Sequence, residues 1–112
     1  MIIKSLKPFT SKEIVAASEQ FDSYIKTVID LDKEICIAGM DRHYEGEQTL
    51  LSDGSKQSNL WGGGIDLDTK IIDFNSFINI RPNDNNPSND ILDPGLRAKY
   101  EELTKYFFKA IL

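Results

Sequence analysis

The stretch from residue 58 to residue 81, SNLWGGGIDLDTKIIDFNSFINIR, constrains the fold of this chain more than any other. Apolar and polar residues alternate over much of it, which is typical of strands that bury one face. Residues 59–67 and 71–81 are therefore predicted to form an antiparallel hairpin that turns at Asp68-Thr69-Lys70. The core face of the second strand would carry Ile72, Phe74, Ser76, Ile78 and Ile80. Its other face would carry Asp73, Asn75, Phe77, Asn79 and Arg81, and we expect a binding site there.

Length and charge limit the classes of protein that this chain can belong to. A chain of 112 residues is expected to form a single domain, residues 1–112. The net charge of −5 argues against a general nucleic-acid binder, which normally carries a basic stripe. No apolar window reaches the length of a membrane span, and the first residues do not resemble a signal peptide, so we expect a soluble, acidic, cytoplasmic protein.

Cys36 is the only cysteine, which rules out an internal disulfide and a cysteine-based zinc site. It lies in the apolar run ICIAG and is predicted to be a small buried hydrophobic residue. No motif in the sequence predicts a cofactor or a metal ion.

Two helices have well-marked starts. Thr10 as N-cap places Glu13 at the third helical position, which is the capping-box arrangement, so a helix is predicted over residues 11–22. Asp93 as N-cap and Pro94 as first helical residue begin the last helix.

The remaining elements follow from the hydrophobic pattern. Residues 24–30 and 34–39 are predicted to form a hairpin connected by Leu31-Asp32-Lys33, in a register that opposes Asp30 and Glu34. In that register Ile25, Thr27, Ile29, Ile35 and Ile37 share one face. Further expectations are a short edge strand at residues 2–6, a helix at residues 44–53 and a long polar loop at residues 82–93. The chain is thus predicted to be α+β, in the order α-ββ-α-ββ-α, with a four-stranded, mainly antiparallel sheet and three helices mostly on one face.

The triple glycine at residues 62–64 has two interpretations. A phosphate-binding loop would lead into a helix and place a lysine and a serine or threonine after the last glycine, whereas here a strand follows. A bulge, a bend or a close backbone approach beside Trp61 is therefore favoured. Trp61 itself is either a core residue or a site residue, and the core is favoured.

Two functions from different classes remain open. The leading hypothesis is a small binding or interaction module that uses the polar and aromatic strand face, with a small ligand or a protein as partner. Arg81 is its most important residue, because a guanidinium can hold a carboxylate or phosphate through two parallel hydrogen bonds. The candidate ligand-binding residues are Trp61, Asn75, Asn79, Arg81, His43 and Glu47.

The alternative is a small hydrolase acting on phosphoesters or RNA. His43 and Glu47 would serve as its acid-base groups and Arg81 would stabilise an anion. It requires His43 and Arg81 to converge across one cleft. A third hypothesis is a homodimer formed through a strand edge or the last helix.

Two segments, GSKQSNLWG at residues 54–62 and FINIRP at residues 77–82, give the chain a family resemblance. It resembles small prokaryotic proteins with a G-S-x-Q-x-x-L-W-G segment and an I-N-I-R-P segment, classed as a domain of unknown function. The resemblance implies no activity, and it directs interest to Gly54, Ser55, Gln57, Leu60, Trp61, Gly62, Asn79, Arg81 and Pro82. Gly63 and Gly64 depart from the family pattern, in which a larger polar residue follows the tryptophan-glycine pair.

Overall fold

The computed structural model describes all residues from 1 to 112 and contains one antiparallel sheet with the strand order β1-β3-β2-β4-β5. The strands are β1 (Ile3–Ser5), β2 (Tyr24–Asp30), β3 (Ile35–Ala38), β4 (Leu60–Asp66) and β5 (Ile72–Asp73). The helices are α1 (Ser11–Ala17), α2 (His43–Ser52) and α3 (Pro94–Phe107), with short 3₁₀ turns at Gln57–Asn59, Phe77–Asn79, Pro82–Asp84 and Lys109–Ile111. The α+β class is confirmed, but the sheet has five strands instead of four, because β1 pairs with β3.

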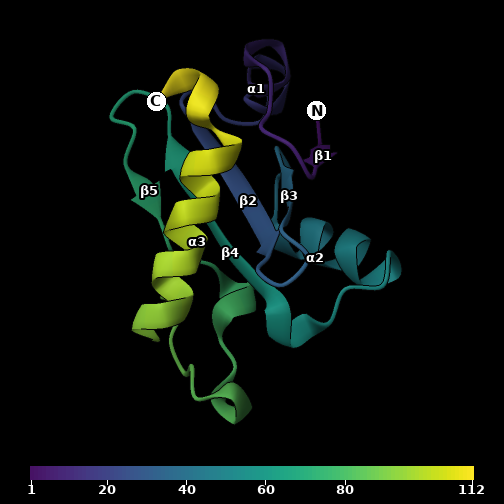
Figure 1. Cartoon of the computed structure of the whole chain (residues 1–112), viewed down its shortest axis with the longest axis vertical. Coiled ribbons are helices and arrows are strands. Elements are labelled where there is room, and N and C mark those ends of the chain that lie inside the picture. The colour runs from purple at the N-terminus through teal and green to yellow at the C-terminus, as the bar shows by residue number, and fades with distance from the viewer.

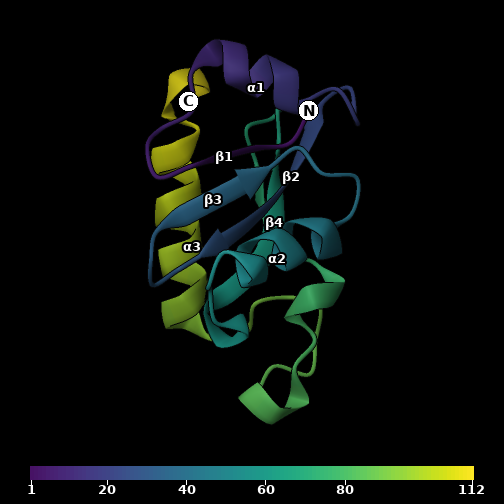
Figure 2. The same cartoon turned by 90° about the vertical axis from the view of Figure 1, so that its right-hand side faces the viewer.

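Helices cover both faces of the sheet. Neighbouring residues of a strand point to opposite faces of the sheet, so Val28 and Ile29 of β2 belong to two different hydrophobic clusters. Ile29 belongs to the larger cluster with residues of α1 and α3, and Val28 belongs to the smaller one with Leu50 of α2. Figure 1 shows α3 lying lengthwise across the sheet, and Figure 2 shows α1 at the upper end of the molecule. Two of the three helices, α1 and α3, thus pack on one face of the sheet, and α2 packs on the other.

The two predicted helix starts are confirmed. Thr10 Oγ1 accepts a hydrogen bond from the Glu13 N–H (3.1 Å), and the Glu13 carboxylate accepts one from the Thr10 N–H (2.9 Å). Asp93 accepts from the Leu96 N–H at 2.8 Å, with Pro94 in the first turn of α3. The first helix ends at Ala17 and not at residue 22, with Ser18 as its C-cap, whose hydroxyl donates to the Val15 carbonyl at 2.7 Å.

The first hairpin has a different register from the predicted one. Asp30 pairs with Ile35, so the connection has one more residue than expected. The Asp30 carboxylate accepts from the backbone N–H groups of Asp32 (2.9 Å) and Lys33 (2.8 Å), and Glu34 takes a positive φ of 57°. This side-chain cap lengthens the turn and moves Ile37 to the α2 face, opposite Val28.

The second strand of the other hairpin is much shorter than predicted. After Asp73 the chain leaves the sheet, because the Asp73 carboxylate accepts from the Asn75 N–H at 2.8 Å and closes a local turn. The side chain of Asn79 then makes the hydrogen bonds to β4 that the backbone of a neighbouring strand would otherwise make. Its Oδ1 accepts from the Gly62 N–H, and its Nδ2 donates to the Gly62 carbonyl, both at 2.9 Å. One consequence is that Ile80, predicted to be core, is 44 % exposed.

The three glycines of β4 allow other groups to approach the strand closely, which is one of the three interpretations that the sequence favoured. A Cβ atom at Gly62 would lie 2.7 Å from the Ser76 side chain and 3.0 Å from His43. A Cβ atom at Gly63 would collide with the Asp73 carbonyl, and one at Gly64 with the Tyr24 hydroxyl. Gly62 and Gly64 therefore form a low floor beneath Ser76, His43 and Tyr24.

Candidate functional site

A groove lies above this floor, on the α2 side of the sheet. Two adjoining hollows of about 380 Å³ and 230 Å³ share Lys26, His43, Ser76 and Phe77 as lining residues. The larger hollow is also lined by Arg42, Tyr44 and Ile78. The smaller one is also lined by Tyr24, Asn75 and Asn89. We call this combined surface the His43 groove.

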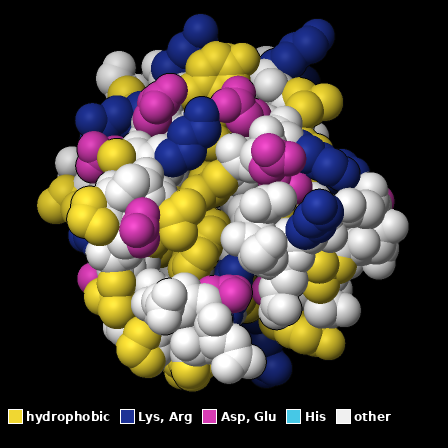
Figure 3. Space-filling view, turned by 60° about the horizontal axis from the view of Figure 1, so that its bottom comes forward, with side chains coloured by type: hydrophobic (Ala, Val, Ile, Leu, Met, Phe, Trp, Pro, Cys, Tyr) yellow, Lys and Arg dark blue, Asp and Glu magenta, His cyan; other side chains and the backbone are white.

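The side chains that line the His43 groove carry positive charge only, and the nearest carboxylate, Asp73, accepts hydrogen bonds from Tyr24 (3.2 Å) and Asn75 (2.9 Å) at its edge. The lining includes Lys26 and Arg42 but no carboxylate residue. The Arg42 guanidinium is exposed and makes no hydrogen bond or ion pair within the protein. Lys26 Nζ donates to the Asp41 carbonyl at 2.9 Å, which leaves its charge unneutralised by a carboxylate. On the face shown in Figure 3, by contrast, basic and acidic side chains are interspersed without a continuous basic patch.

The groove also exposes aromatic rings. Phe77 is 85 % exposed, the most of any large hydrophobic side chain in the chain, and Tyr44 is 61 % exposed. Phe77 projects because it opens a 3₁₀ turn that Ser76 caps by accepting a hydrogen bond from the Ile78 N–H. The turn thus holds an apolar ring in water beside two cations.

His43 stands at the centre of the groove with a fixed ring. Its Nε2 lies 2.6 Å from the carbonyl oxygen of Gly63, and because a carbonyl only accepts, Nε2 carries the proton and donates. Burial lowers the pKa of His43, and the nearby Lys26 charge acts in the same direction, while the Gly63 hydrogen bond and Asp73 oppose the shift. His43 is therefore neutral at pH 7.

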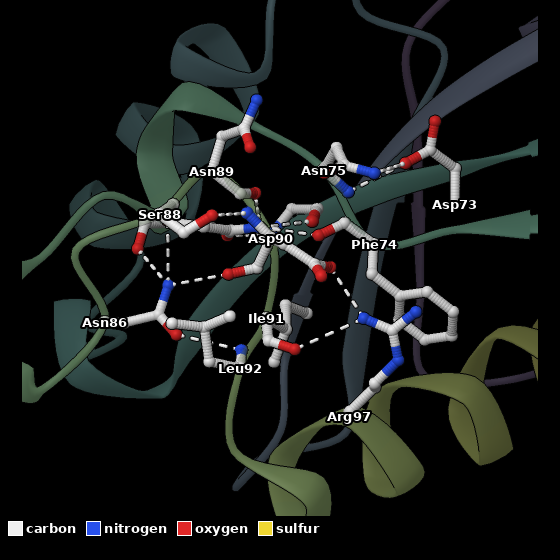
Figure 4. Close-up of polar contacts among 12 residues, drawn as sticks. Asp73, Phe74, Asn75, Asn86, Ser88, Asn89, Asp90, Ile91, Leu92 and Arg97 are labelled. Atoms are coloured by element: carbon white, nitrogen blue, oxygen red, sulfur yellow. Dashed lines mark hydrogen bonds and ion pairs between the residues drawn. The ribbon is translucent and has the colours of Figure 1, made fainter.

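The loop that forms the wall of the groove is held by its own polar network, shown in Figure 4. The Asn86 amide donates to the carbonyls of Ser88 (2.9 Å) and Asp90 (2.8 Å). Arg97 of α3 donates to the Asp90 carboxylate at 2.6 Å and lies over the Phe74 ring at 3.9 Å. The asparagines and aspartates of this loop thus fix its shape.

Most of the residues predicted as ligand-binding lie behind the groove. His43 and Asn75 line it, but Trp61, Asn79, Arg81 and Glu47 are buried and line neither hollow. The side chains that the hydrolase hypothesis combines are therefore not brought together in one cleft. Glu47 is 5 % exposed, and its Oε2 has no hydrogen-bond partner.

Arg81 holds the protein backbone instead of facing solvent. Only 7 % of it is exposed. Its guanidinium donates to the carbonyls of Ile78 (2.9 Å), Gln57 (2.6 Å) and Leu60, and it lies over the Trp61 ring at 4.2 Å. The sequence drew attention to the segment that contains Phe77 but not to Lys26 and Arg42, which come from β2 and from the residue before α2.

Fold and site together define a small α+β domain with a cationic, aromatic groove on one face of its sheet. The family described as protein of unknown function, DUF5674, matches residues 1–107, and the chain belongs to it. This confirms the expectation of a family of unknown function. No curated protein and no solved structure matches the chain. None of its helices is long and apolar enough to cross a membrane.

Proposed function

We propose that the protein is a binding module whose His43 groove takes a small ligand with both a flat ring and an anionic group. A mononucleotide is the ligand class that fits best. The observation that carries this proposal is the exposed Phe77 ring beside Lys26 and Arg42 in a lining without carboxylates.

The charged groups suit an anion such as a phosphate. The guanidinium of Arg42 has all its donors free, so it can hold two phosphate oxygens with parallel hydrogen bonds. Lys26 adds a point charge in the same groove. Because no carboxylate lines the groove, an anion entering it meets no like charge on the lining side chains.

The aromatic surface and the size suit one nucleobase. Stacking on an aromatic side chain contributes about 1–3 kcal/mol per base. The larger hollow, of about 380 Å³, falls in the size range of small-molecule sites, and the smaller one, of about 230 Å³, adjoins it. A long nucleic acid fits less well, since the net charge of −5 opposes the approach of a polyanion.

An amide-resolved NMR titration tests the proposal with adenosine 5′-monophosphate, adenosine and ribose 5-phosphate as probes. We expect the nucleotide to give saturable shifts at Arg42, His43 and Phe77, and to bind more tightly than either fragment. Shifts absent at millimolar nucleotide, or clustered away from the groove, would contradict the proposal.

Matched variants separate the two kinds of contact. Phe77→Ala should weaken nucleotide binding by about tenfold or more, because stacking is lost, and Phe77→Leu should restore only part of the loss. Arg42→Ala should weaken binding of the nucleotide but not of adenosine. Lys12→Ala removes an exposed charge on α1 and should leave all affinities unchanged. Equal effects of Arg42→Ala and Lys12→Ala would show that the groove exerts only a general charge effect.

A further inference from the structure

We propose that His43 determines which ligands the groove accepts, because its Nδ1 accepts a hydrogen bond from an N–H or O–H group of the bound ligand. This inference rests on the proposed function and adds a specificity determinant to it.

The orientation of the imidazole ring is fixed by β4. Nε2 donates to the Gly63 carbonyl at 2.6 Å, and Cδ2 lies 3.0 Å from the position of a Cβ atom on Gly62. The edge between Cδ2 and Nε2 therefore faces the strand. In an imidazole the atom opposite that edge is Nδ1, so Nδ1 points away from β4, toward the side on which the ring lines both hollows.

The chemistry of Nδ1 follows from the same hydrogen bond. With the proton of the neutral ring on Nε2, Nδ1 carries a lone pair and can only accept. No group of the protein donates to it, although Lys26, Ser76 and Tyr24 line the same groove. The groove thus combines donors for an anion, from Lys26 and Arg42, with one oriented acceptor.

An unpaired acceptor of this kind discriminates between ligands. A site that hydrogen-bonds a particular N–H or O–H rejects the analogue that lacks it, because the bound analogue covers the protein atom and excludes water without offering a donor. A fully ionised phosphate has no proton to give to Nδ1, so it is directed to Arg42 and Lys26. The donor must come from the rest of the ligand, and a nucleotide offers two sources, the amino group of the base and the sugar hydroxyls.

Calorimetric titration of wild type and His43→Gln with three probes tests the inference. The probes are adenosine 5′-monophosphate, purine riboside 5′-monophosphate, which lacks the amino group, and 2′,3′-dideoxyadenosine 5′-monophosphate, which lacks the sugar hydroxyls. We expect wild type to bind one of the two analogues about 10–100-fold more weakly than the parent nucleotide, and the weakened analogue identifies the donor. Glutamine can keep the hydrogen bond to Gly63 through its Nε2, and its only acceptor, Oε1, is bonded to the carbon next to that donor and not at the position of Nδ1. His43→Gln should therefore bind all three probes within about a factor of three of one another.

Each alternative result decides a different point. If wild type binds all three probes equally, or if the discrimination survives in His43→Gln, the inference is overturned while the proposed function stands. If wild type binds none of the probes, both fail. Ring ¹⁵N shifts of the free protein give an independent check, since a proton found on Nδ1 would overturn the inference without any ligand.

Discussion

Replacing Arg81 with alanine is expected to lower the free energy of unfolding by about 3–5 kcal/mol, because a hydrogen bond to a charged group contributes about 1.5–3 kcal/mol. The guanidinium donates to the carbonyls of Ile78, Gln57 and Leu60, and only 7 % of the residue is exposed. Three such bonds at the low end of the range give about 4–5 kcal/mol. Burying the guanidinium also costs the wild-type protein desolvation energy, which reduces the net loss of stability in the alanine variant.

Chemical denaturation followed by circular dichroism measures this loss without relying on the fluorescence of Trp61, whose ring contacts Arg81 at 4.2 Å. Arg81→Met keeps an apolar side chain over the Trp61 ring but donates no hydrogen bond, so it should lose most of the same stability. Arg42→Ala is the matched control, because that arginine makes no internal contact of this kind, and it should change stability by less than about 0.5 kcal/mol. An Arg81→Ala variant within about 1 kcal/mol of wild type would refute the reasoning.

Two further predictions concern the strand β4 and the acid stability of the fold. Gly63→Ala should destabilise the protein by about 1–3 kcal/mol, because the added Cβ would collide with the Asp73 carbonyl and lie 2.7 Å from the Tyr100 hydroxyl; an unchanged melting temperature would contradict this. Burial lowers the pKa of His43 below its usual 6.5, so between the two values the unfolded chain binds more protons. The free energy of unfolding should therefore fall as the pH drops below about 6.5, and His43→Gln, compared by pH-dependent denaturation, should lose this part of the pH dependence.

Structural features that depend only on residues close together in the sequence could be predicted from it. The capping box of Thr10 and Glu13 and the start of α3 at Asp93 each depend on contacts three residues apart, so the local sequence contains the whole interaction. The first hairpin was predicted as an element but with the wrong register. Its register depends on whether Asp30 caps the turn, and alternation of apolar residues carries no information on that.

The candidate site could be predicted only in part because it is assembled from distant segments. Lys26 belongs to β2, Arg42 precedes α2, and Phe77 opens a 3₁₀ turn after β5. Nothing in the sequence near any one of them indicates the other two. His43 was identified because a lone histidine is conspicuous, but its partner, the Gly63 carbonyl, is a backbone atom that no motif records.

The segment from Asp73 to Arg81 shows why an alternating pattern misled the prediction of the second hairpin strand and of which side chains face solvent. An alternating pattern fits a strand. It equally fits a segment that leaves the sheet and whose side chains form hydrogen bonds to the backbone of the neighbouring strand. Asn79 pairs with Gly62 through its amide, and Arg81 reaches the Leu60 carbonyl, so both are buried. Phe77, in the same segment, has no such partner and stays in water. The buried and exposed side chains of this segment thus have different roles. Substitutions of Arg81 should lower the stability of the fold, and substitutions of Phe77 should lower the affinity for the ligand. A Phe77→Ala variant that unfolds more easily but binds normally would reverse this assignment.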